Sequence, residues 1–206
     1  MNSHNYKLAM FPLHTFLLPG EEIPLRIFEP RYIELIEDCE KTGMKFGIPY
    51  TTKEEITSYG CEVELQSIVA KNSLNEMVVL IKCVRNFHLL DFFDELPNKQ
   101  YGGGVIEYVD DDFNTNNPEL IVLVKKLQLE INPVIGAIAT HDSFKLFDIA
   151  KSLLLKSEDK YKLYALRNHL RMEKYLIKQL KFYELVKNNE DALQKNLDKK
   201  TKRDAT

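Results

Sequence analysis

The hydrophobic and polar positions divide the chain into two halves with different periods. In the first half, short apolar runs and alternating apolar and polar positions recur between turn residues, which is typical of β-strands. The pattern predicts strands within residues 7–20, 21–28, 45–51, 61–72, 76–93 and 101–112, the fifth being one long strand or two. Several short strands with one early helix indicate a closed or sandwiched β domain.

A helix interrupts these strands directly after the second one. From residue 30 to 41 the period changes to that of a helix, and Gly43 follows the last periodic position. Pro30 stands at the first turn, where a helix tolerates a missing N–H. The stretch IPLRIFEPRYIELI, residues 23–36, therefore joins a buried strand to a helix through the charged joint 29–31. The apolar face of this helix comprises Tyr32, Ile33, Leu35, Ile36 and Cys39.

The second half has the period of helices. The pattern predicts helices over residues 117–131, 142–155 and 157–188, each beginning at a capping residue. The last of these is one long helix or two helices bent near Asn168. Residues 189–206 are rich in charge and poor in apolar side chains, which predicts a flexible tail. The apolar face of the last helix comprises Leu166, Leu170, Ile177 and Leu180.

We therefore predict an α+β protein with three parts. Residues 1–116 form a β-barrel subdomain, residues 117–188 form a helical subdomain packed on or beside it, and residues 189–206 form the charged tail. Apolar residues make up 44% of the 206 positions and charged residues 29%, so the chain can bury a sizeable core.

The net charge of −3 hides a difference between the two halves. Residues 1–116 carry ten Lys and Arg against 19 Asp and Glu, whereas residues 117–206 carry 18 against 12. Affinity for nucleic acid depends largely on cationic contacts with phosphates, so the acidic first half argues against a nucleic-acid partner.

Three widely spaced cysteines indicate in which cellular compartment the protein is expected. Cys39, Cys61 and Cys83 lie among apolar residues and form no CxxC pair, which argues against a zinc knuckle or a dithiol motif. Reduced core thiols fit a cytoplasmic protein. No secretory signal is visible, and no apolar run approaches the roughly 20 residues that a membrane helix needs.

No motif in the sequence predicts catalysis. A Walker phosphate loop is missing, and the glycines at 102–104 lead into a strand rather than a helix, so a bulge or a close backbone approach explains them better than phosphate binding. The histidines lack metal-ligand spacing, and the acidic run 110–112 lacks the glycine and the terminal glutamate of an EF-hand loop. We predict no catalytic residue, no cofactor and no metal. A hydrolase that uses a cysteine or a histidine stays open as a minor alternative.

One loop stands out by its apolar side chains. Residues 16–18 are three consecutive large apolar residues next to Pro19, and they cannot all face one side of a strand. Either both faces are buried there or a side chain reaches the surface, where an apolar patch usually marks a contact site. The predicted peptide-binding residues are Phe16, Leu17, Leu18, Pro19 and Ile23.

The segment FPLHTFLLPGEEIPLRIFEPRYIELI, residues 11–36, closely resembles the N-terminal segment of the Lon protease substrate-binding domain, in particular its stand-alone bacterial form. Residues 46–48 and 78–89 are similar to later strands of that family, although Cys83 replaces a usual glycine, and the helical part matches less sharply. The resemblance covers about residues 6–185. The matching positions in the first segment are Phe11, Pro12, Leu13, Leu18, Pro19, Gly20, Pro24, Leu25, Arg26, Ile27, Phe28, Glu29, Pro30, Arg31 and Tyr32.

The resemblance implies a PUA-like β pseudo-barrel followed by a C-terminal helical bundle. In the full-length protease this module helps to capture protein substrates ahead of an ATPase and a Ser–Lys peptidase, and this chain has room for neither. It implies a non-catalytic polypeptide-binding module for unfolded or extended segments, with a separate protease as a further candidate partner. PUA-like folds include RNA-binding proteins, but the acidic first half argues against RNA.

An adaptor or oligomerisation role is the alternative, because the basic C-terminal helices offer a surface for docking a partner or a second copy. The sequence leaves the oligomeric state open.

The family-motif residues around the joint are expected to be structural. Glu29 stands where an acidic side chain can accept hydrogen bonds from free helix N–H groups. Arg26 and Arg31 are close enough in sequence to pair with it or with nearby carbonyls and so to fix the angle between strand and helix. The set comprises Pro24, Arg26, Phe28, Glu29, Pro30, Arg31 and Tyr32.

Overall fold

The structure, a computed structural model, describes residues 5–131 and 144–204 and divides into two compact units. Unit 1 comprises residues 1–111 and 156–165, and unit 2 comprises residues 112–155 and 166–206. The division lies close to the predicted boundary after residue 116, but a short segment from the second half belongs with the strands.

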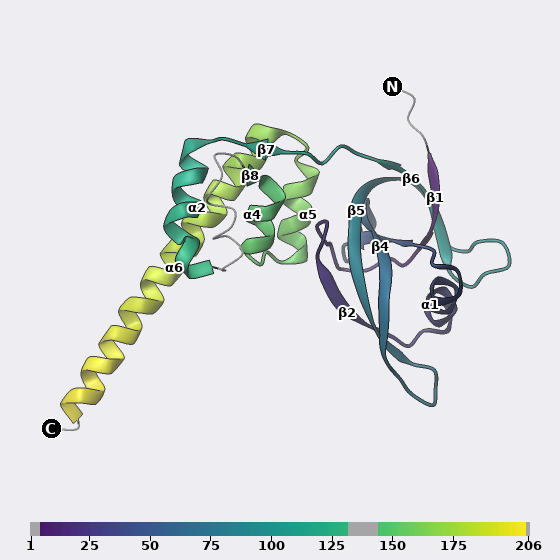
Figure 1. The fold of residues 1–206 in the computed structure, drawn as a ribbon, viewed down its shortest axis with the longest axis horizontal. Coiled ribbons are helices and arrows are strands. Elements are labelled where there is room, and N and C mark those ends of the chain that lie inside the picture. The colour runs from purple at the N-terminus through teal and green to yellow at the C-terminus, as the bar shows by residue number, and fades with distance from the viewer. Residues whose placement is uncertain (1–4, 132–143, 205–206) are drawn as a thin grey trace. The chain divides into compact units, whose positions relative to one another are not determined.

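Six strands of unit 1 form one sheet that closes on itself (Figure 1). The sheet order is β2-β5-β4-β3-β1-β6, and β5 also pairs with β6, so every strand except β2 lies in a closed ring. The pairs are antiparallel apart from β1 with β3. The strands are β1 (Tyr6–Met10), β2 (Glu22–Ile27), β3 (Phe46–Thr51), β4 (Ile56–Lys71), β5 (Met77–Phe93) and β6 (Gly102–Tyr108).

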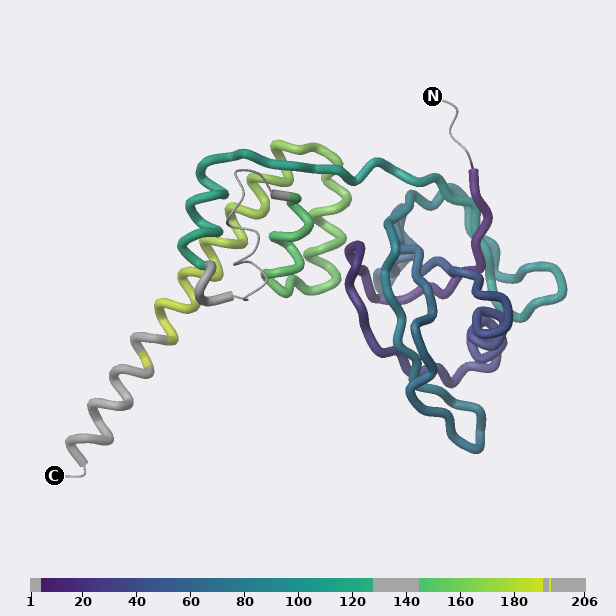
Figure 2. The backbone as a smooth tube through the Cα atoms, in the orientation of Figure 1, coloured from purple at the N-terminus to yellow at the C-terminus, as the bar shows by residue number. Residues whose placement is uncertain are grey.

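Strand β5 is long enough to pair with two different strands along the same side. Residues 77–82 pair with β2 and residues 87–93 pair with β6, while β4 follows the other side of the strand. The tube in Figure 2 shows β4 and β5 running together into their shared hairpin. The structure therefore shows one strand where the sequence allowed one or two.

Glycines allow β6 to approach β5 closely. A Cβ atom at Gly102 would lie 2.6 Å from the carbonyl oxygen of Phe93, and one at Gly104 would lie 2.7 Å from that of Asp91. Only a residue without a side chain fits at these two positions. The close backbone approach predicted for residues 102–104 is confirmed.

Helix α1 (Pro30–Thr42) follows β2 as predicted. Pro30 occupies the first turn, and Gly43 ends the helix in the left-handed conformation (φ 70°), donating its N–H to the carbonyl of Cys39 over 2.9 Å. The residues that α1 buries against the strands have the spacing of one helix face: Tyr32, Leu35, Ile36 and Cys39.

The three cysteines are free and buried in unit 1, which confirms the prediction of reduced core thiols. Burial raises the pKa of the Cys39 thiol to about 12. A hydrogen bond with Cys61, together with burial, raises the pKa of Cys83. Because a nucleophilic cysteine needs a thiolate at neutral pH, neither Cys39 nor Cys83 suits the hydrolase alternative.

Asp38 connects α1 to the segment that precedes β6. Its Oδ2 accepts hydrogen bonds from Lys99 Nζ over 2.5 Å and from the Tyr101 hydroxyl over 2.7 Å. The hydrogen bond from Lys99, followed by that from Tyr101, holds the pKa of Asp38 below its usual value.

Replacing Asp38 with asparagine is expected to lower the melting temperature at about pH 7 and to have less effect as the pH falls below about 4. The folded-state pKa of Asp38 is depressed, so its contribution is complete above the unfolded-state pKa and is lost as the pH falls through the folded value. Thermal melts of both proteins across this pH range measure the difference. A difference that does not change with pH would contradict the assignment.

Within its described residues, unit 2 has three helices and a short two-stranded sheet. Asn117 caps α2 through its side chain, accepting the N–H of Glu119 over 3.0 Å. Helix α4 covers the middle of the helix predicted over 142–155, whose first two residues lie outside the described residues. Helix α6 continues through 189–204, which the sequence assigned to a tail. The elements are β7 (Asn114–Thr115), α2 (Pro118–Ile131), β8 (Phe144–Lys145), α4 (Leu146–Ser152) and α6 (His169–Asp204).

The last predicted helix is two helices, α5 (Ser157–Ala165) in unit 1 and α6 in unit 2. The break lies at Arg167, whose φ is 43°, and the Asn168 side chain accepts the N–H of Arg171 to cap α6. The predicted apolar face was right at Leu180, which is buried, and wrong at Leu170, which is 66% exposed. A turn at residue 167 shifts the phase of α6, so that Met172 and Leu176 are buried together with Leu180.

No helix in the described ranges is both long enough and apolar enough to cross a membrane.

Candidate binding groove

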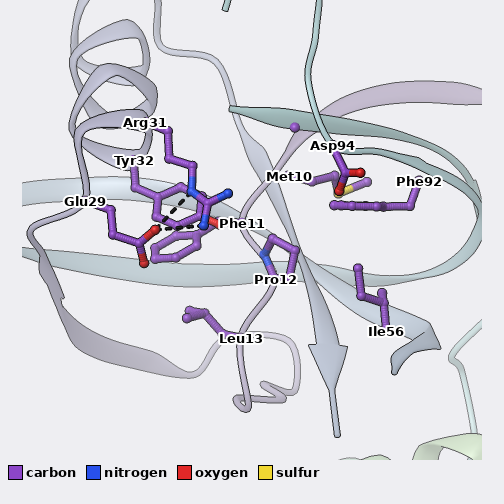
Figure 3. Close-up of a pocket in the computed structure, with 11 residues that line it drawn as sticks. Met10, Phe11, Pro12, Leu13, Glu29, Arg31, Tyr32, Ile56, Phe92 and Asp94 are labelled. Carbon is purple, nitrogen blue, oxygen red and sulfur yellow. Dashed lines mark hydrogen bonds and ion pairs between the residues drawn. The ribbon is translucent and has the colours of Figure 1, made fainter. Parts of the chain in front are cut away.

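A groove of about 320 Å³ lies in unit 1 where β1 ends and α1 begins (Figure 3). Five separate stretches of the chain contribute to it, and most of the side chains are apolar. Its volume is at the lower end of the range of ligand sites, which suits one large side chain with its neighbouring backbone. The lining residues are Met10, Phe11, Pro12, Leu13, Glu29, Arg31, Tyr32, Ile56, Phe92, Asp94 and Gly102.

The chain beyond β1 forms the floor of the groove. Phe11 donates its N–H to the carbonyl of Gly47 over 2.8 Å, and Leu13 donates to that of Pro49 over 3.2 Å, so the chain continues along β3. Pro12 lies between these two donors, and its backbone nitrogen therefore points away from β3. Because no hydrogen bond to β3 is made from this position, the missing N–H of proline costs none. Pro12 and Leu13 remain half-buried, with their side chains on the groove.

An aromatic pair supports one wall of the groove. The rings of Phe11 and Tyr32 stack with 3.8 Å between centroids, and the guanidinium of Arg31 lies 4.8 Å from the Tyr32 ring. These contacts place the cation beside an apolar surface, where it can recognise a polar group of a ligand.

The charged joint forms the rim. Arg31 donates from Nε (3.0 Å) and Nη2 (2.8 Å) to the same oxygen of Glu29, while Asp94 lies across the pocket (Figure 3). The hydrogen bonds to Glu29 raise the pKa of Arg31, and Asp94 adds to this effect. The rim therefore offers a permanent cation between two carboxylates, a combination that can bind the carbonyl and N–H groups of a peptide backbone.

The predicted structural role of the joint holds only in part. Glu29 occupies the N-cap position of α1, but its side chain bonds Arg31 instead of a helix N–H. Arg26 pairs with Glu76 over 3.2 Å and not with Glu29. The side chains of Glu29 and Arg31 are about half exposed, and such pairs contribute only about 0–1 kcal/mol. The ion pairs Glu29–Arg31 and Arg26–Glu76 are therefore too weak to fix the angle between strand and helix.

The aromatic residue before the joint also differs from expectation. Ile27 ends β2 inside the core as expected, whereas Phe28 is 57% exposed. Pro24 is exposed on β2, which is the strand outside the closed ring. Because proline supplies no N–H, it weakens this edge as a template for adding a further strand.

The loop predicted to bind peptide lies in the interior of unit 1. Phe16, Leu17 and Leu18 are 0%, 2% and 0% exposed, while Pro19 and Ile23 are half-buried. Of the two possibilities that the sequence left open, the structure shows burial of all three apolar side chains. A role of these residues in binding stays a prediction.

Sequence reasoning missed the far side of the groove. Ile56, Phe92 and Asp94 belong to stretches around the ends of β4 and β5 that carry no motif. The only signal for the groove is that the family motif supplies its other side, from Phe11–Leu13 and Glu29–Tyr32. Closure of the barrel brings these stretches together.

Comparisons with known proteins agree with this fold. A crystal structure of a Lon N-terminal domain protein from Xanthomonas campestris is similar with a TM-score of 0.62 and 26% identity, covering 83% of this chain and 97% of that one. The N-terminal domain of Mycobacterium avium complex Lon protease is similar in fold, with a TM-score of 0.63 and 12% identity over 85% of this chain and 98% of that one. A comparison with curated proteins gave no match.

The predicted α+β fold class is thereby confirmed. The family model for the ATP-dependent protease La (LON) substrate-binding domain matches residues 7–197, nearly the whole chain. This protein belongs to the LON substrate-binding domain family.

Proposed function

We propose that this protein is a non-catalytic, cytoplasmic polypeptide-binding module that holds unfolded or extended segments in the groove beside α1. The observation that carries the proposal is the groove itself: an apolar floor and a charged rim, built largely from the residues by which the chain resembles its family. A family named for substrate binding supports a polypeptide as the ligand.

The groove fits an extended chain better than a folded partner. The half-buried Pro12, Leu13 and Phe92 can contact one large apolar side chain. Arg31 and Asp94 face the backbone on either side of it. Of the Arg31 N–H groups, those on Nε and Nη2 bond to Glu29, which leaves the second terminal nitrogen for a peptide carbonyl. Such a groove would recognise an apolar side chain and the peptide backbone of its ligand rather than a specific amino-acid sequence.

Replacing Phe92 with aspartate is expected to weaken binding of a reduced and alkylated model protein by about tenfold or more. The substitution removes apolar surface from the groove and places a second carboxylate near Asp94. Fluorescence anisotropy with the labelled unfolded protein measures the affinity, and circular dichroism verifies the fold.

Phe93 provides the matched control, because neighbouring strand residues point to opposite faces and Phe93 is not part of the groove lining. Phe93→Asp should bind as the wild type does. Arg31→Gln changes only an exposed side chain, so it tests the rim without a risk to folding. Unchanged binding by both folded groove variants, or no binding of the unfolded protein by the wild type, would exclude the groove.

The adaptor alternative has its own supporting observation. Phe182, Leu185 and Val186 of α6 are exposed, and they lie on adjacent turns of the helix. One nearby cation is engaged within unit 2, however, since Lys181 pairs with Glu119 over 2.7 Å. Truncation after residue 188 with measurement of molar mass in solution tests whether α6 mediates assembly.

A further inference from the structure

Helix α5 covers an aromatic surface of the barrel within unit 1. Tyr161 of α5 stacks on Tyr50 with 4.7 Å between ring centroids and lies 5.6 Å from Phe16. Tyr164 of α5 lies 5.3 Å from Phe16 and 5.2 Å from Tyr59. We name the barrel side of this contact, which comprises Phe16, Tyr50 and Tyr59, the aromatic seat.

An ion pair fixes the register of α5 on the aromatic seat. Lys160 Nζ donates to Glu21 Oε1 over 2.6 Å, and the two side chains are only 11% and 18% exposed. The other Glu21 oxygen accepts the N–H of Leu18 over 2.8 Å, so the barrel loop itself orients the carboxylate. A sheltered, oriented carboxylate selects for a cation at one position of the helix that packs there.

Helix α5 buries Leu163 and Tyr164 completely, and it also has several features of a segment that docks. It has nine residues, a length at which an isolated helix is marginal in water. Leu154 before it (φ 49°) and Arg167 after it (φ 43°) adopt the left-handed conformation, which side chains disfavour. The chain enters unit 1 only for residues 156–165 and belongs to unit 2 on both sides.

We propose that the aromatic seat is a second polypeptide-binding surface, which α5 occupies as an internal ligand. Its external partner is an amphipathic helical segment that carries a lysine followed by aromatic residues one and four positions later, the pattern of Lys160, Tyr161 and Tyr164. This surface includes Phe16, for which the sequence predicts a role in binding. The inference does not rest on the proposed groove, because the two sites share no residue.

Two alanine variants that delete the same ring contact distinguish a ligand-binding seat from ordinary packing. Tyr161→Ala weakens α5 and leaves the seat intact, so a labelled peptide of residues 156–166 should bind to the full chain about tenfold more tightly than to the wild type. Tyr50→Ala damages the seat and should show no gain. Fluorescence anisotropy measures both affinities, with a scrambled peptide as a control.

A gain in affinity for Tyr161→Ala without a gain for Tyr50→Ala is the decisive result. Packing alone predicts that both variants lose stability to a similar degree and that neither gains affinity for the peptide, and that outcome would overturn the proposal. An equal gain in both variants would overturn it too, because it would indicate binding to a loosened chain. Phe92→Asp should leave peptide binding unchanged, which separates failure of this site from failure of the groove.

A charge exchange tests the register without removing any ring. In the Glu21→Lys chain, a peptide that carries Lys160→Glu should bind more tightly than the native peptide, and in the Tyr161→Ala chain the order should reverse. If the two peptides had the same order of affinity in both chains, Glu21 would not select the charge of the ligand. The proposed recognition pattern would then be wrong.

Discussion

Replacing Phe16 with alanine is expected to lower the free energy of unfolding by about 3–5 kcal/mol. The side chain is fully buried and touches rings on both the barrel and α5, so its removal leaves a cavity that surrounding rings cannot all fill. In a protein of this size such a loss corresponds to a fall in melting temperature of roughly 6–20 °C. Equilibrium urea unfolding followed by circular dichroism measures the change.

Phe28→Ala is the matched control, because it deletes the same side chain from an exposed position. Its effect should stay within about 0.5 kcal/mol. Comparable losses for the two variants would mean that the burial of Phe16 is not what stabilises the loop. A stable Phe16→Ala protein that had lost only peptide binding would return residues 16–18 to the surface role that an exposed apolar patch suggests.

Gly60→Ala is expected to destabilise unit 1 by about 3 kcal/mol or more, although it adds a single methyl group. A Cβ atom at Gly60 would lie 2.6 Å from the carbonyl oxygen of Ile48 and 2.6 Å from the ring of Phe87. The carbonyl belongs to the neighbouring strand and cannot turn away as a flexible side chain would, so β3 and β4 must separate locally. Urea unfolding with an unchanged m-value would show a loss of stability in an otherwise intact fold.

The glycine that ends α1 provides a contrast in mechanism. Gly43 has open space around its Cα, and only its φ of +70° opposes a side chain. Gly43→Ala should therefore cost about 1–2 kcal/mol through conformation alone. If Gly60→Ala cost no more than this, the steric conflict between β3 and β4 would be absent.

Local signals explain why much of the fold could be predicted. Pro30 and Gly43 delimit α1, Asn117 caps α2, and both kinds of signal act within a few residues of the chain. The strands have period-2 alternation or continuous apolar runs for the same local reason. The division into a strand-rich and a helical half needed no knowledge of tertiary contacts.

Features that depend on distant contacts could not be predicted. The burial of Phe16 depends on Tyr161 and Tyr164, which lie about 150 residues later in the sequence. No local sequence pattern around these tyrosines predicts that they contact Phe16. The buried face of α6 was predicted only at Leu180, because the turn at Arg167 resets the helical phase. The groove was missed because Phe92 and its neighbours acquire a role only when the barrel closes.

The split of unit 1 between residues 1–111 and 156–165 has a consequence for synthesis on the ribosome. All six strands of the barrel have been translated once Tyr108 is added, but α5 is not complete until Ala165. At about 5–20 residues per second, translation of the intervening segment takes roughly 3–11 s. During that interval the nascent barrel lacks the helix that covers Phe16, Tyr50 and Tyr59, so these rings are open to contacts with other proteins.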